Sequence, residues 1–161
     1  MPLSRQWLLN GHPRARGIED TDFLLVEREI PSPQAGEILL KSLYLGFDPA
    51  QKGWMENIAD YVAPMAIGDV MRGSAISEVT ESHHPDYAVG DLVMGSTGWT
   101  EWHISKGDGL VKITTDLPPT AMLSVLGTTG VTAYCGLFKV GRPVAGDMVL
   151  VSGAAGATGS V

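Results

Sequence analysis

The sequence is poor in several features that mark particular classes of protein. It holds one cysteine, Cys135, which excludes an internal disulfide and favours a reducing compartment. The formal net charge is -7 and no cluster of basic residues occurs, which argues against a nucleic-acid partner. No apolar run approaches membrane-spanning length, and the first residues lack the layout of a signal peptide. These absences predict a soluble, cytoplasmic chain.

Metal ligands are also scarce. A structural zinc usually takes four cysteines, and a catalytic zinc takes three protein ligands. His83 and His84 are neighbours in one turn, His12 lies in a Gly-Pro turn, and His103 lies in a β-type run. We therefore predict that no metal is bound. Cys135 lies in a helical pattern among apolar residues, which predicts a buried, inert thiol.

Short β-type runs dominate the first part of the chain. The chain is 44% hydrophobic and 18% charged, which predicts a packed globular protein. Runs of alternating or continuous apolar residues are separated by turns rich in glycine and proline. They read RQWLLN, DFLLVEREI, EILLKSLYLGF, SAISEVTE, DLVMGS and EWHISK. This order predicts a barrel or sandwich over roughly residues 1–115.

A stretch between these runs has no clear period but is rich in methionine and aromatic residues. Trp54, Met55, Tyr61, Met65 and Met71 either pack under a long loop or form an apolar pocket wall, in which the Tyr61 hydroxyl donates to a substrate oxygen. We expect Arg72, which follows Met71 in the stretch MRGSA, to form a structural salt bridge.

The pattern changes near residues 115–120. Pro118 and Pro119 precede Thr120, a helix start, and a second helical run ends near Gly141. The apolar run Met148–Val151 then predicts a strand that leads into a glycine-rich turn.

That turn reads G-A-A-G-A-T-G, with Gly153, Gly156 and Gly159 three residues apart. Small residues here let a pyrophosphate approach the main chain, whose free N–H groups bind it. The spacing is a relaxed form of the dinucleotide motif, so by itself it leaves a plain core turn equally open. No Lys-Ser or Lys-Thr follows at the distance a triphosphate loop needs.

Six stretches together resemble a known family. They are YLGFDP, MRGSAISEV, HPDYAVGDLVMG, GWTEWHI, LGTTGVTAYCGL and VLVSGAAGATGSV. In this order they resemble the zinc-independent medium-chain dehydrogenase/reductases, in the branch of leukotriene B4 dehydrogenase, prostaglandin reductase and alkenal double-bond reductase. The resemblance runs from about residue 5 to the end of the chain.

The resemblance implies a fold and an activity. The fold is a mainly β, chaperonin-10-like, partly open barrel, followed by helices and the first strand of a truncated Rossmann domain. We place the substrate domain at residues 1–118 and the incomplete dinucleotide-binding part at 119–161. The implied activity is NADPH-dependent reduction of the carbon–carbon double bond of α,β-unsaturated ketones or aldehydes, in a full-length protein that is a homodimer.

Site residues are carried over by position. The cofactor positions are Thr132, near the nicotinamide, and the pyrophosphate loop Ala155, Gly156, Ala157, Thr158 and Gly159. The candidate substrate pocket is Phe47, Tyr61, Ser96, Thr97 and Trp99.

The chain also departs from the family's pattern. Ala50 stands where relatives have a tyrosine that can face the substrate, and Ser74 stands where some carry another pocket tyrosine. The enone carbonyl is therefore held differently, or the substrate is larger, and no catalytic residue is assigned.

Two alternatives stay open. One is a quinone oxidoreductase of the same superfamily, which GTTGVTAY fits almost as well. The other is a non-enzymatic barrel module that binds a small apolar ligand. We further expect the 161-residue chain to be a truncated form that binds dinucleotide weakly and turns over little or nothing.

Overall fold

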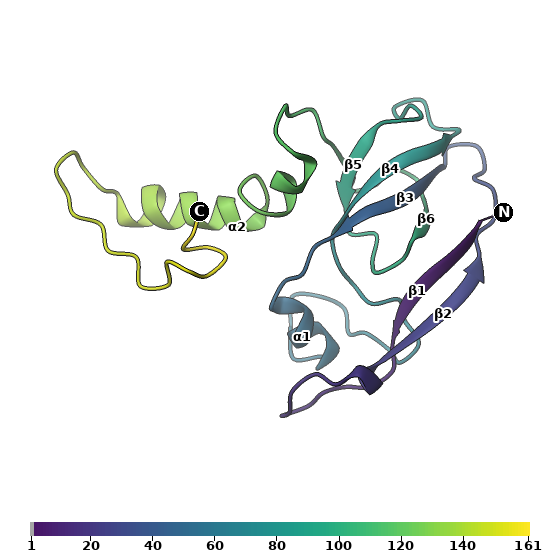
Figure 1. Cartoon of the computed structure of the whole chain (residues 1–161), viewed down its shortest axis with the longest axis horizontal. Coiled ribbons are helices and arrows are strands. Elements are labelled where there is room, and N and C mark those ends of the chain that lie inside the picture. The colour runs from purple at the N-terminus through teal and green to yellow at the C-terminus, as the bar shows by residue number, and fades with distance from the viewer. Residues whose placement is uncertain (1) are drawn as a thin grey trace. The chain divides into compact units, whose positions relative to one another are not determined.

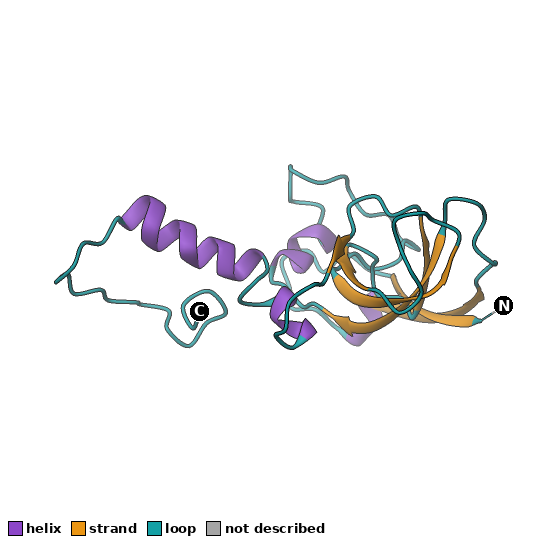
Figure 2. Cartoon of the chain, turned by 90° about the horizontal axis from the view of Figure 1, so that it is seen from above, coloured by secondary structure: helices purple, strands orange, loops and turns teal. Residues whose placement is uncertain are grey.

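A computed structural model describes residues 2–161. The chain divides into two compact units, Met1–Ile113 and Thr114–Val161. Within the described residues all seven strands lie in the first unit, and the second has only helical and turn segments (Figures 1 and 2).

The first sheet is a pair of antiparallel strands, β1 (Leu3–Leu9) and β2 (Phe23–Glu29). Alternate residues of β1 face inward, and two of them, Ser4 and Gln6, are polar. Both reach the Thr100 hydroxyl, at 2.9 Å from the Ser4 oxygen and 3.2 Å from the Gln6 amide nitrogen. The inward polar groups of β1 therefore fix the segment around Thr100 against the sheet.

The second sheet has five antiparallel strands in the order β6-β3-β4-β5-β7. Its strands are β3 (Ile38–Leu45), β4 (Ala75–Ser82), β5 (Leu92–Gly95), β6 (Trp102–Ser105) and β7 (Val111–Lys112). The consecutive apolar residues at the start of β3 are all buried, as expected for a strand covered on both faces. A left-handed φ of 79° at Gly36 turns the chain into this strand.

The prediction of a mainly β fold with a partly open barrel is confirmed. Isolated bridges pair β1 with the segments that precede β6 and β4, Gln6 with Thr100 and Leu8 with Val70, and within residues 2–161 the two sheets do not close into a complete barrel. Two apolar clusters fill the unit. One holds Ile38, Leu40, Val79 and Val93, and the other holds Leu9, Met55, Met65 and Met71.

The long loop between β3 and β4 contains a helix that the sequence did not predict. This helix, α1 (Ala50–Met55), is one of two short helical segments of the first unit, with the single turn η1 (Asp20–Asp22). Met55 and the two later methionines of the stretch belong to the core, so the packing interpretation holds for them. Trp54 is half-buried and packs against this core, whereas Tyr61 is exposed.

The second unit holds η2 (Pro119–Leu123), α2 (Thr128–Tyr134) and a π-type segment η3 (Cys135–Gly141). The strand predicted over Met148–Val151 is not formed. A strand needs a neighbour to pair its main-chain groups, and no segment of this unit pairs with the run, which leaves Met148 98% exposed.

Cys135 is exposed rather than buried. The prediction was wrong because the apolar face of its helical segment is not covered within the unit: Val131 and Phe138 are exposed as well.

Candidate functional site

Helix α1 begins at an Asp-x-x-Gln sequence that satisfies its own first turn. The Asp48 carboxylate accepts a hydrogen bond from the Ala50 N–H at 2.7 Å, and the Gln51 side-chain oxygen accepts one from the Asp48 N–H at 3.1 Å. Reciprocal contacts of this kind fix helix N-termini. The Gln51 amide nitrogen donates to the carbonyl oxygens of Gly46 and Arg72, at 3.1 and 3.3 Å. Gln51 therefore ties the helix to the segment before β4.

The last turn of α1 carries Trp54, which contacts a tyrosine and an arginine. The Trp54 indole N–H donates to the Tyr61 phenol oxygen at 3.1 Å, although Tyr61 is 69% exposed. The Arg72 guanidinium carbon lies 5.8 Å from the Trp54 ring centroid, a distance at which a cation is attracted to the ring. Arg72 also donates through Nη2 to the Ala63 carbonyl at 3.0 Å, whereas its Nη1 is buried and has no partner among residues 2–161.

The loop that carries Tyr61 is closed at its base by Asn57. The Asn57 side-chain oxygen accepts from the Met65 N–H at 2.7 Å, and its amide nitrogen donates to the Met65 carbonyl at 3.0 Å. Asn57 has a φ of 54°, a left-handed conformation that asparagine tolerates better than most residues. Met65 is a core residue, so the loop is anchored to the interior of the unit.

Trp99 is the centre of a second aromatic group. Its ring stacks on Phe23, with centroids 5.5 Å apart, and meets the edge of Phe47 at 5.2 Å. Phe47 is 76% exposed. Two polar atoms of this segment, the Trp99 indole nitrogen and the Thr97 hydroxyl, are buried and have no hydrogen-bond partner in the part of the chain that the structure describes, while Ser96 is exposed. An apolar wall with a few polar groups is typical of small-molecule sites.

A groove of about 340 Å³ lies beside Trp99 and Thr100. Its apolar walls come from strands β1, β2 and β3, and its polar wall is the ion pair of Arg5 and Glu101. The Arg5 guanidinium holds the pKa of the Glu101 carboxyl below its ordinary value of 4.5, chiefly through their hydrogen bond.

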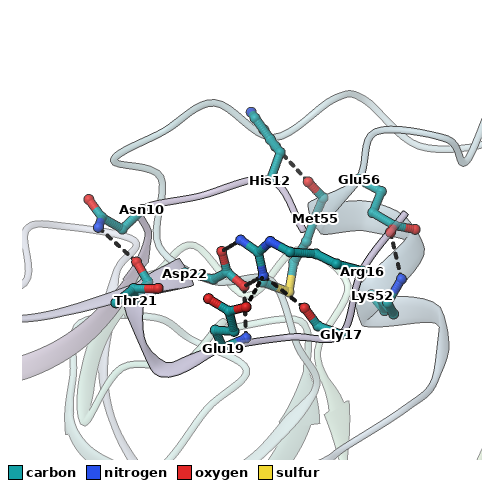
Figure 3. A network of polar contacts seen from close by, with 10 residues as sticks. All are labelled: Asn10, His12, Arg16, Gly17, Glu19, Thr21, Asp22, Lys52, Met55 and Glu56. Atoms are coloured by element: carbon teal, nitrogen blue, oxygen red, sulfur yellow. Dashed lines mark hydrogen bonds and ion pairs between the residues drawn. The ribbon is translucent and has the colours of Figure 1, made fainter. Parts of the chain in front are cut away.

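A polar network holds the loop between β1 and β2 against α1 (Figure 3). Arg16 donates to both carboxylate oxygens of Asp22, at 2.9 and 2.5 Å, and this contact lowers the pKa of the nearly buried Asp22 carboxyl. His12 Nδ1 lies 2.6 Å from the Met55 carbonyl oxygen. A carbonyl can only accept, so Nδ1 carries the proton. The loop therefore braces the end of the helix that presents Trp54.

In the second unit, the proposed cofactor positions lie on α2 and on the glycine-rich turn. The Thr132 hydroxyl donates to the Thr128 carbonyl at 2.7 Å. The turn is exposed, and within residues 2–161 no protein acceptor takes the N–H groups of Ala155, Ala157 or Thr158. A side chain at Gly159 would meet the Gly153 carbonyl oxygen at 2.1 Å, so only glycine fits there.

These features fit a pyrophosphate: small residues, accessible main chain and free N–H donors. No hydrogen bond joins Thr132 to the turn within residues 2–161.

Among the predicted substrate residues, the structure brings Phe47 and Trp99 into contact, and Thr97 lies two residues before Trp99 along the chain. Tyr61 belongs to the separate contact with Trp54. The salt bridge expected for Arg72 is wrong: no carboxylate of residues 2–161 lies within ion-pair distance of it, because its guanidinium stacks on Trp54 instead.

Sequence reasoning missed Gln51 and Asn57. The Asp-x-x-Gln spacing was a signal for the first. Nothing in the sequence marks the second, because its partner lies eight residues away in an irregular loop.

Within residues 2–161, no three histidine, cysteine, aspartate or glutamate side chains gather as a metal site. None of the helices in those residues has the length and apolar character needed to cross a membrane.

Comparison with known proteins identifies the family. A family model described as the N-terminal domain of oxidoreductase matches residues 5–113. The NADPH-dependent curcumin reductase of Escherichia coli (strain K12) is 41% identical over 159 residues, covering 98% of this chain and 46% of that protein. Prostaglandin reductase 1 of Oryctolagus cuniculus is 37% identical over 169 residues, which cover 100% of this chain and 45% of that protein. The 2-alkenal reductase (NADP(+)-dependent) of Nicotiana tabacum is 34% identical over 156 residues, which cover 95% of this chain and 45% of that protein.

A solved structure agrees with these relatives. The crystal structure of CurA from Vibrio vulnificus in complex with NADPH has a TM-score of 0.87 and 37% identity to this chain, covering 97% of it and 46% of CurA. The chain therefore belongs to the zinc-independent medium-chain dehydrogenase/reductases, in the branch that contains curcumin reductase, prostaglandin reductase and 2-alkenal reductase. It spans about half the length of the curated relatives it matches.

Proposed function

We propose that the protein to which this chain belongs is an NADPH-dependent reductase that adds hydride to the carbon–carbon double bond of α,β-unsaturated aldehydes and ketones. The observation that carries the proposal is the similarity, over 95% of the chain, to a reductase whose name specifies a 2-alkenal and NADP(+). A 2-alkenal is an aldehyde conjugated to a carbon–carbon double bond. The name of the E. coli relative specifies NADPH as well.

In this proposal the second unit contributes to dinucleotide binding. The free main-chain N–H groups of Ala155, Ala157 and Thr158 would hold the pyrophosphate, and Thr132 would lie near the nicotinamide. NADPH, when bound, supplies the hydride. The exposed turn, its free donors and the fit of glycine alone at position 159 support this role.

The first unit holds the substrate. Phe47 and Trp99 form an apolar wall for the alkenyl chain. Negative charge develops on the carbonyl oxygen as hydride reaches the β-carbon, so a donor aimed at this oxygen lowers the barrier. Tyr61 is the donor we assign, because its hydroxyl is exposed and its oxygen is already held by Trp54.

The test is an NADPH-oxidation assay on the whole protein and, separately, on the 161-residue chain. We expect the whole protein to oxidise NADPH with a 2-alkenal and not with the saturated aldehyde of equal length. We expect the chain alone to bind NADPH weakly and to turn over little. Oxidation with a quinone but not with a 2-alkenal overturns the proposal in favour of a quinone reductase. A full rate from the chain alone overturns the division of the site between this chain and the rest of the protein.

A further inference from the structure

We propose that Trp54 is a positioning residue for Tyr61: the indole N–H holds the phenol oxygen so that the phenol proton stays free for the substrate oxygen, and Arg72 holds the indole. The inference rests on the proposed function, in which Tyr61 donates to the carbonyl oxygen. Trp54 itself does not touch the substrate in this arrangement.

The direction of the hydrogen bond follows from the chemistry of the two groups. An indole nitrogen can only donate, so the Tyr61 oxygen is the acceptor in the contact of 3.1 Å. A phenol oxygen that accepts one bond still has its own proton to give. Within residues 2–161 no protein group accepts that proton. The contact therefore fixes the oxygen and leaves the donor function unused.

Arg72 acts on the indole from its face. Its guanidinium lies 5.8 Å from the ring centroid, and its Nη2 is fixed by the Ala63 carbonyl. No carboxylate of residues 2–161 pairs with it. An unneutralised cation over the ring draws electron density from the indole, which strengthens the N–H as a donor.

The loop does not depend on this contact for its shape. Asn57 and Met65 close its base with two hydrogen bonds, and Arg72 holds Ala63 independently. The bond between Trp54 and Tyr61 then determines where one exposed hydroxyl lies, rather than whether the loop forms.

The first test uses the isotope-labelled 161-residue chain and its tryptophan indole N–H resonances in solution. The resonance of Trp54 is the one lost in Trp54→Phe. Tyr61→Phe removes its acceptor, so we expect this resonance to move upfield while the other three stay in place. Tyr44→Phe is the matched control, since Tyr44 is also exposed and lies on β3. An unchanged Trp54 resonance in Tyr61→Phe overturns the inference.

The second test measures 2-alkenal reduction by the whole protein. We expect Tyr61→Phe to lower kcat about 100-fold, as for loss of one oxyanion donor. Trp54→Phe keeps the ring and removes the N–H, and we expect kcat to fall about tenfold with KM within about twofold. The double variant should be no slower than Tyr61→Phe alone, because the two residues act as one unit.

The outcomes separate the two proposals. Effects of Trp54→Phe and Tyr61→Phe that multiply, or a Trp54→Phe effect confined to KM, overturn the positioning role and leave the reductase proposal intact. If the unaltered protein reduces no 2-alkenal, the proposed function is overturned and the inference falls with it.

Discussion

Gly73 is the residue whose replacement tests the packing of the candidate site most sharply. It is buried under Trp99, and its φ is not in the left-handed region, so its backbone accepts alanine. An alanine methyl at this position would stand 2.7 Å from the Trp99 indole nitrogen and 2.9 Å from Trp99 Cδ1. It would also stand 2.9 Å from the Gln51 amide nitrogen.

The cost follows from what has to move. Ordinary contacts between such atoms are about 3.5–4.0 Å, so Trp99 must retreat by roughly 1 Å. The ring is held on one side by the stack on Phe23 and on another by the edge of Phe47, so it cannot swing freely. Overpacking of this kind costs about 1–3 kcal/mol. We expect Gly73→Ala to lower the melting temperature by roughly 4–12 °C, at roughly 4 °C per kcal/mol for a chain of this size.

The assays are thermal unfolding, which gives the melting temperature, and urea unfolding of the 161-residue chain, both followed by tryptophan fluorescence and circular dichroism. Gly53→Ala is the matched control, because its nearest neighbour is Ile58 at 3.9 Å and it lies inside α1. A glycine inside a helix costs about 0.5–1 kcal/mol relative to alanine, so this variant should be slightly more stable. A Gly73→Ala chain with the urea midpoint and tryptophan spectrum of the unaltered chain would refute the reasoning.

Three further predictions concern stability, each checked by urea unfolding. Because the hydrogen bond with Arg16 lowers the Asp22 pKa below 3.8, the ionised Asp22 carboxylate stabilises the fold above pH 3.8. Asp22→Asn should therefore be less stable than the unaltered chain above this pH, and the difference should disappear as the pH falls through the lowered pKa. Burial lowers the His103 pKa below 6.5, so stability should fall as the pH drops from 6.5 through the lowered value, and His103→Gln should lack this fall. Met71→Ala should cost about 2–5 kcal/mol, and exposed Ile67→Ala less than about 0.5 kcal/mol.

The strands were predictable because their signal is local. The run DFLLVEREI marks β2 to within one residue at each end, and EILLKSLYLGF contains β3. The run at Met148–Val151 has the same local character yet forms no strand. A strand forms only where a neighbouring strand pairs with its main-chain N–H and C=O groups. An apolar run in the sequence does not indicate whether such a neighbour is present.

Helix α1 was missed because it has six residues and no apolar period. It is held by tertiary contacts of Gln51 and by burial of Met55. Propensity over so short a segment decides little, since isolated short helices are marginal.

The candidate site was predictable only in part. Phe47 and Trp99 were both named from the sequence, but their contact joins residues far apart along the chain. It depends on main-chain bonds such as Trp7 N–H to the Trp99 carbonyl, at 2.9 Å, which no local pattern encodes. The salt bridge predicted for Arg72 was wrong for the same reason. Its guanidinium lies over the ring of Trp54 in place of an acidic partner, and Trp54 belongs to helix α1, which the sequence did not predict.

The most direct test of the account follows the hydride itself. The whole protein is given a 2-alkenal and NADPH that carries deuterium at the transferable position, and the product is analysed by NMR. Conjugate addition predicts a saturated aldehyde with deuterium on the β-carbon. An unsaturated alcohol with deuterium on the former carbonyl carbon would contradict the proposed function, and with it the role assigned to Tyr61.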